Sequence, residues 1–135
     1  MTIKVHNMKG VTPKLAAALL YHDIRTSDDL LVACATRRQR EDLARRVGVE
    51  PEVLLELANR ADLARINGVG GIYCDLLEHT GVDTVRELAR RRPDNLYRAI
   101  VSANRQKQLA KMPPSEDMID GWIKQARIIS QMLEY

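Results

Sequence analysis

The chain has 135 residues, which is enough for one sizeable hydrophobic core and too few for a large α/β enzyme. It has no Phe, 4 Tyr and 1 Trp among many Leu, Ala, Arg and Glu residues, so we expect an all-α fold. The formal charge is only +3, no apolar run reaches the roughly 18 residues of a membrane span, and no signal-peptide pattern is present. We therefore expect a cytoplasmic protein.

Capping residues mark the first two predicted helices. Thr12 and Pro13 predict an N-cap and the first residue of a helix, because proline has no N–H to lose there and its φ is already helical. A second helix is predicted after Thr26. Two aspartates lie in its first turn, where they face the positive end of the helix.

Two longer helices are predicted next. Thr36 and Gln39 have the spacing of a capping box, in which each side chain satisfies a backbone amide near the other residue. The helix that they open ends at Gly48. Pro51 then opens a connecting helix over residues 51–65, which carries an apolar stripe.

Glycines interrupt the helical pattern at "INGVGG", residues 66–71. The next predicted helix ends at Gly81, and capping residues at Thr84 and a proline at Pro93 open two more. A last helix is predicted over residues 115–133. Its apolar face carries Met118, Ile119, Trp122, Ile123, Ala126, Ile129 and Leu133.

The sequence contains an internal repeat. Residues 8–30 match residues 66–88 without a gap at an offset of 58, with five identities. The identities fall on a turn glycine, on apolar positions and on an N-cap threonine, which are the positions that a shared fold would keep. We predict a single domain, residues 1–135, built from two pseudo-repeats at about residues 8–48 and 66–106.

Charge is distributed unevenly along the chain. Between Arg86 and Lys111 there are eight basic and two acidic residues, whereas between Glu50 and Asp62 there are four acidic residues and one arginine. Clustered charge attracts oppositely charged partners more strongly than the net charge suggests. The basic segment is a candidate surface for a polyanion, although most such runs are simply a solvated helix face.

The glycines of "INGVGG" allow two different explanations. A turn between two helices needs residues with positive φ, which glycine adopts without steric cost. Glycine also exposes backbone amides, and together with the unpaired N–H groups of the following helix these form a concavity suited to an anion. Architecture alone and phosphate contact therefore both remain open.

The pattern in which an apolar residue, a spacer and Gly-Val-Gly precede a helix resembles the helix-hairpin-helix family, whose fold is similar to that of SAM domains. The resemblance implies that Ile66, Gly68, Val69 and Gly70 form the hairpin, and that the amides of residues 68–71 contact a nucleic-acid phosphate. Taken whole, the chain looks like a bacterial family of two such modules that is known only as a domain of unknown function. The fold implied is two helix-hairpin-helix units packed around one core.

The first copy departs from this pattern. "MKGVTPK" keeps Gly10 and Val11 but has Thr12 and Pro13 in place of the two later glycines. Proline removes one amide from the anion-binding concavity, so the first hairpin looks degraded as a binding site. Two flanking lysines can compensate by direct charge.

The function expected is a non-enzymatic module that binds nucleic acid, most plausibly duplex DNA without sequence preference. Arginine favours this interpretation because its planar guanidinium group fits phosphate. The predicted contacts are Gly68, Val69, Gly70, Gly71, Arg65, Lys9, Gly10, Lys14, Arg90, Arg91 and Arg92.

A protein-interaction or scaffolding domain is the alternative, in which the hairpins only pack helices. The predicted C-terminal helix motivates it, since Met118, Ile119, Met132 and Leu133 would offer an apolar surface to a partner or a second copy.

Enzymatic and cofactor-dependent functions have no support in the sequence. His6, His22 and His79 are dispersed, and no metal-ligand or nucleotide-binding spacing is found, so we predict no catalytic residue, metal or cofactor. Cys34 and Cys74 stand in apolar helical segments and are expected to be buried free thiols.

Overall fold

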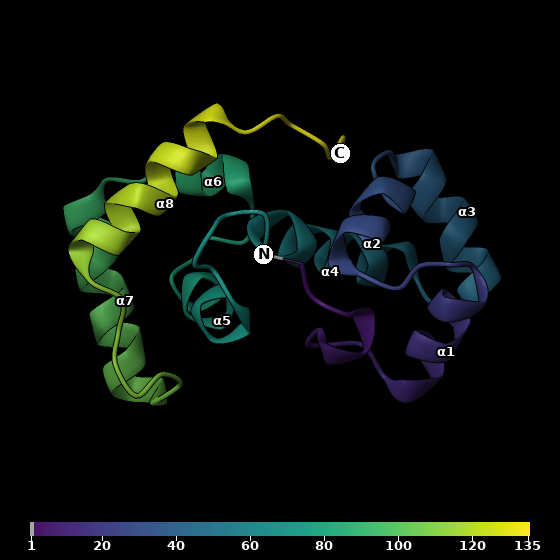
Figure 1. The fold of residues 1–135 in the computed structure, drawn as a ribbon, viewed down its shortest axis with the longest axis horizontal. Coiled ribbons are helices and arrows are strands. Elements are labelled where there is room, and N and C mark those ends of the chain that lie inside the picture. Colours follow the sequence, from purple (N-terminus) through teal and green to yellow (C-terminus); the bar gives the residue numbers. More distant parts are fainter. Residues whose placement is uncertain (1) are drawn as a thin grey trace. The chain divides into compact units, whose positions relative to one another are not determined.

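The protein is all-helical in a computed structural model that describes residues 2–135. Over these residues the chain forms a short 3₁₀ turn, Val5–Asn7, followed by eight α-helices (Figure 1). Their bounds are α1 Pro13–Tyr21, α2 Ser27–Ala33, α3 Arg37–Val47, α4 Pro51–Leu63, α5 Gly71–His79, α6 Val85–Ala89, α7 Pro93–Lys107 and α8 Glu116–Ile128.

The helices belong to two compact units. The N-terminal unit comprises Thr2–Asp62 together with Gln131–Tyr135, and the C-terminal unit comprises Leu63–Ser130. The buried side chains likewise form two clusters, and each cluster lies within one unit. One shared core is expected from the sequence, whereas the buried residues of 2–135 divide into two clusters. The single-domain organisation stays a prediction.

In the N-terminal unit, the predicted caps of three helices are confirmed. Thr12 accepts a hydrogen bond from the amide of Leu15, and Thr26 and Thr36 each form a complete capping box. Gly48 ends α3 in the left-handed conformation at φ +76°. These contacts satisfy amides and carbonyls that a helix end leaves without partners, so the helix ends follow from local sequence.

In the C-terminal unit, α8 packs along α6 and α7, and α5 packs against α7 (Figure 1). Its centre contains Trp122, which is 2% exposed, with Leu77 and Ile100 among the fully buried side chains around it. Helix α8 ends at Ile128, although the apolar pattern predicts a helix that continues to residue 133. Ile129 has extended backbone, and the following residues are not helical.

The offset of 58 residues also relates backbone features. Helices α1 and α5 both have nine residues, and their first residues are Pro13 and Gly71. Gly10 and Gly68 both have φ +92°, and the amide that follows each glycine donates to a carbonyl three residues earlier. The two turns therefore have matching backbones despite different residues at their helix starts.

Two of the turn glycines differ in what surrounds them. A Cβ atom on Gly68 would lie 3.1 Å from Nε1 of Trp122, whereas one on Gly10 would lie 3.6 Å from a methyl group of Leu57, which is an ordinary contact. Both positions have a φ that L-amino acids rarely adopt. Gly68 thus has two structural reasons to be glycine and Gly10 has one.

Arg40 and Cys34 make up a buried polar corner of the N-terminal unit. The guanidinium group of Arg40, a residue that is 3% exposed, donates to the carbonyl of Cys34 at 2.9 Å. Burial raises the pKa of the Cys34 thiol to about 11, and the positive charge of Arg40 only partly offsets this. The thiol is therefore protonated in the folded protein at any physiological pH.

No helix in the described part of the chain combines the length and the apolar character that crossing a membrane requires.

Replacing Gly68 by Ala is expected to lower the free energy of unfolding by about 1–3 kcal/mol, because the new Cβ meets both the positive φ and the Trp122 indole. Urea denaturation followed by circular dichroism measures this. Gly121→Ala is the matched control: Gly121 lies inside α8 with open space around it, so alanine should raise stability by up to about 1 kcal/mol. An unchanged stability of Gly68→Ala would contradict the crowding at Trp122.

Ionisation of Cys34 should weaken the fold at alkaline pH. The thiol of the unfolded chain loses its proton near pH 9, whereas the folded one keeps it up to about pH 11. The stabilising effect is therefore complete below pH 9 and is lost as the pH rises toward 11, a change on the order of 2–3 kcal/mol. Urea denaturation of the wild type and of Cys34→Ala at pH 8 and about pH 10.5 tests this. An equal pH dependence in both proteins would contradict it.

Candidate nucleic-acid interface

The turn between α4 and α5 holds the predicted phosphate site. The side chain of Val69 is fully buried, and its N–H donates to the carbonyl of Ile66 at 3.1 Å. The amide of Asn67, two residues earlier, donates to the side chain of Gln125 at 2.9 Å. The Val69 amide is therefore not available to a ligand in this conformation, although Gly68 itself is exposed.

Helix α5 begins with amides that its own backbone does not satisfy. Gly70 is the N-cap and offers no side-chain acceptor, and no acidic residue lies in the first turn. The first amide to bond back along the helix is that of Cys74, which donates to the carbonyl of Gly70 at 2.9 Å. In helix geometry the N–H groups of Gly71, Ile72 and Tyr73 consequently lack an intrahelical acceptor. Gly71 and Ile72 are exposed.

In the first turn, the residues at the corresponding positions leave fewer backbone amides without a partner. There the hydroxyl of Thr12 takes the amide of Leu15, and Pro13 has no amide to offer. The backbone at the two N-caps is similar: φ −75° and ψ 160° at Thr12, against φ −91° and ψ −170° at Gly70. The two turns thus differ in exposed amides but little in shape.

The fold does not require glycine at either Gly70 or Gly71. Neither has the positive φ that excludes other residues, and a Cβ atom at either position meets nothing within 4 Å. Thr12 and Pro13 show that a threonine and a proline suit the same backbone. Within the helix, at Gly71, glycine costs stability relative to other residues, whereas at an N-cap such as Gly70 it is about as favourable as threonine. Gly71 above all therefore calls for an explanation outside packing.

A groove of about 750 Å³ runs beside these glycines and is formed partly by the loop that follows α7. Its walls include the exposed side chains of Ile72 and Met112, which are 53% and 75% exposed, and the exposed Lys111. Ile72, Lys111 and Met112 are not among the contacts predicted from the sequence, although Lys111 ends the basic segment of residues 86–111. No local signal links residues 109–112 to the glycine turn, because only the packing of α5 against α7 brings them together.

Two of the arginines predicted to contact phosphate bind backbone carbonyls at or just beyond a helix end. Arg65 donates to the carbonyl of Ser130 at 2.8 Å, beyond the end of α8. Arg91 donates to the carbonyl of Thr80, the C-cap of α5, at 3.3 Å. Cations at this end of a helix stabilise it through the unsatisfied carbonyls and the helix dipole. Both side chains therefore have a structural role within the C-terminal unit.

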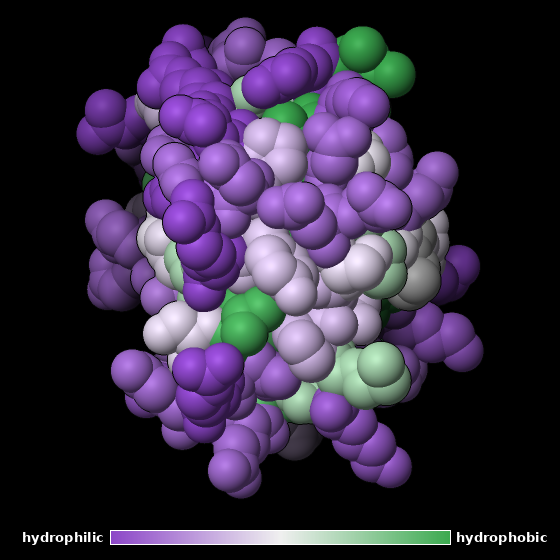
Figure 2. Space-filling model, turned by 90° about the vertical axis from the view of Figure 1, so that its left-hand side faces the viewer, coloured by the Kyte–Doolittle hydropathy of each residue, from purple (hydrophilic) through white to green (hydrophobic). Residues whose placement is uncertain are grey.

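The two neighbours of Arg91 are more exposed. Arg90 is the C-cap of α6, and Arg92 forms an ion pair with Asp94 at 3.3 Å. The face that carries α7 is largely hydrophilic, with small separate hydrophobic spots (Figure 2). The basic run of the sequence thus becomes a mixed polar surface on which some positive charges have local acidic partners.

Lys9, Gly10 and Lys14 belong to the N-terminal unit, whereas the remaining predicted site residues belong to the C-terminal unit. All three are exposed, and Gly10 forms the left-handed corner of the first turn. The structure groups them with Thr12 and Pro13, where the helix start is already capped. Their assistance to the second turn stays a prediction.

Among residues 2–135, no three or more His, Cys, Asp or Glu side chains form a group that could hold a metal ion.

The model of a family described as Domain of unknown function (DUF4332) matches residues 9–129. No curated protein and no solved structure matches the chain.

Replacing Gly71 by Ala is expected to raise the free energy of unfolding by about 0.4–1 kcal/mol, because the backbone there suits any residue and alanine reduces the freedom of the unfolded chain. Thermal and urea denaturation measure the change. A destabilised variant would show that the fold itself needs glycine at this position, and the case for an external ligand would lose its basis.

Proposed function

We propose that this chain, which belongs to the DUF4332 family, is a non-enzymatic module that binds the phosphate backbone of nucleic acid through a helix-hairpin-helix turn. The ligand proposed is duplex DNA, bound without sequence preference. The proposal includes a cytoplasmic location in a bacterial cell.

One observation carries the proposal: the second turn has glycines where neither backbone conformation nor packing demands them. Side chains at Gly70 and Gly71 would stand between an approaching phosphate and the first amides of α5. Glycine lets a ligand come within hydrogen-bonding distance of these amides, and the positive end of the helix dipole favours an anion there. The stability given up at Gly71 is thereby explained.

The binding contacts would combine amides and cationic side chains. The N–H groups of Gly71 and Ile72 point away from the helix they begin, and the exposed Lys111 lies on the same groove. Arg90 and Arg92 would add longer-range attraction. Amides and lysines contact phosphate oxygens and do not read base edges, so such a site gives affinity without sequence specificity.

A protein-interaction module is the second candidate, and the composition of the groove supports it. Ile72 and Met112 expose apolar surface beside the glycines, and Leu109 and Ala110 also line the groove. A partner that buried these side chains would bind with little dependence on salt, unlike a polyanion. Of the four apolar residues predicted to offer a surface on the C-terminal helix, Ile119 and Leu133 are buried.

The decisive experiment exchanges residues between the two turns. The double variant Gly70→Thr with Gly71→Pro gives the second turn the helix start of the first, which removes one amide and caps another. We expect its affinity for a random-sequence duplex to fall about tenfold or more, since a lost hydrogen bond to a charged group is worth 1.5–3 kcal/mol. Fluorescence anisotropy at about 50 and 200 mM salt measures binding.

The reciprocal variant, Thr12→Gly with Pro13→Gly, is the matched control. It opens the first turn beside Lys9 and Lys14 and should strengthen binding or leave it unchanged, while circular dichroism shows that both variants keep their helices. Wild-type protein that does not bind duplex at low salt would end the DNA proposal. Binding that is equally strong in the Thr-Pro variant would place the contact elsewhere.

A further inference from the structure

The five residues Gln131–Tyr135 pack as a bound peptide in the N-terminal unit. Leu133 is 1% exposed and belongs to that unit's hydrophobic cluster, although it follows the C-terminal unit along the chain. It enters the cluster from non-helical backbone, since α8 has already ended at Ile128. One leucine thus completes a core that is otherwise formed by residues before Asp62.

Both main-chain groups of Glu134, its N–H and its carbonyl, are hydrogen-bonded to the N-terminal unit. The N–H of Glu134 donates to the carbonyl of Ala35 at 2.8 Å, and the carbonyl of Glu134 accepts from the guanidinium group of Arg40 at 2.6 Å. Arg40 is held in place by the carbonyl of Cys34. A buried, fixed guanidinium group that binds a backbone carbonyl makes a strong, charge-assisted hydrogen bond.

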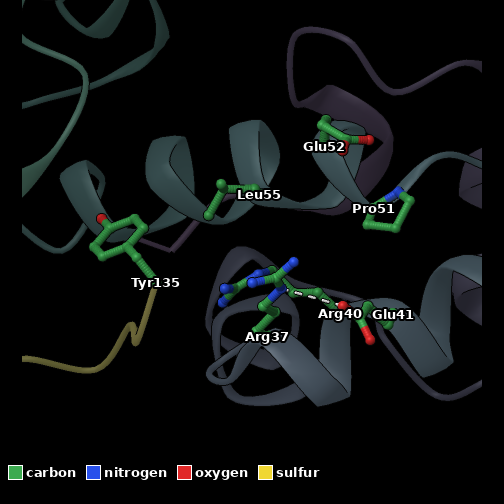
Figure 3. A pocket seen from close by; sticks show the side chains of 7 residues that line it. All are labelled: Arg37, Arg40, Glu41, Pro51, Glu52, Leu55 and Tyr135. Atoms are coloured by element: carbon green, nitrogen blue, oxygen red, sulfur yellow. Dashed lines mark hydrogen bonds and ion pairs between the residues drawn. The ribbon is translucent and has the colours of Figure 1, made fainter.

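The segment also has a side-chain contact at its far end. The hydroxyl of Tyr135 donates to Oδ1 of Asn59 in α4 at 2.9 Å. Its ring closes one end of a cavity of about 290 Å³ between α3 and α4, with Arg37 and Arg40 on one side and Leu55 on the other (Figure 3). Arg40 therefore binds the segment through the main-chain carbonyl of Glu134, a contact that does not depend on the side chain at that position.

We propose that this groove is a docking site for segment 131–135 of a second copy of the chain, so that two copies can exchange their segments. The groups that contact the segment lie in residues 34–59 and in the hydrophobic cluster of the N-terminal unit. A second copy of the chain supplies the same leucine, main-chain groups and tyrosine for them to bind. In an exchanged dimer, each segment makes in the other copy the contacts that it makes in its own chain, so the dimer needs no new surface. The proposal is independent of nucleic-acid binding and does not involve a face of α8.

A labelled peptide with the sequence of residues 128–135 tests the docking site. Leu133→Asp in the full chain removes its own segment from the groove, because a carboxylate cannot enter the cluster. We expect the peptide to bind this variant at least about tenfold more tightly than the wild type, whose own segment competes at a high effective concentration. The same peptide with Asp for Leu133 is the control and should bind neither protein.

Failure of the peptide to bind a folded Leu133→Asp chain, or equal binding of the control peptide, would overturn the proposal. If Leu133→Asp unfolds, light scattering of the wild-type protein provides a second test. Wild-type protein at about 1 mM is expected to contain a dimer, and Tyr135→Phe should contain the same fraction of it, because the hydroxyl bonds to Asn59 in the closed and in the exchanged form alike. Wild-type protein that stays monomeric at this concentration would also overturn the proposal.

Discussion

The close approach of Gly68 to the Trp122 indole is the constraint on which the C-terminal unit depends. A left-handed residue at that point turns the chain out of α4, and the absence of a side chain lets the turn rest on the buried ring. The turn then sets where α5 begins and so where its first amides lie. In the first turn, Gly10 has the same φ, but a Cβ atom there would make only an ordinary contact with Leu57. Gly10 is therefore needed for its backbone conformation alone, whereas Gly68 is needed for its conformation and for the space beside Trp122.

Most of the information about the candidate site comes from comparing the two turns. Matching backbones with different residues act as an internal control that a single turn would not provide. Thr12 and Pro13 satisfy or remove the amides that Gly70 and Gly71 leave exposed. Departures from the locally preferred residue are expected at functional sites, which is why the uncapped start of α5 supports a ligand better than the basic run does.

The arginines show how a charge pattern can be misleading. Arg40, Arg65 and Arg91 each donate to backbone carbonyls beyond helix ends, so part of the positive charge serves the fold. Short helices leave many carbonyls without intrahelical partners, and guanidinium groups reach them across a turn. In an all-helical chain with many helix ends, a high arginine content is therefore expected with or without a polyanionic partner.

The sequence by itself determined helix starts, because an N-cap forms between residues three positions apart: Thr12, Thr26 and Thr36 act as their local patterns predict. It also determined the end of α3, where Gly48 adopts the left-handed conformation. It also placed glycine at both turns. Tertiary structure alone decided that the buried residues form two clusters, that Lys111 and Met112 join the glycine groove, and that Leu133 leaves the predicted helix to enter a distant core. These outcomes depend on contacts between residues far apart in the chain, whose free energy exceeds the local preference for one more helical turn.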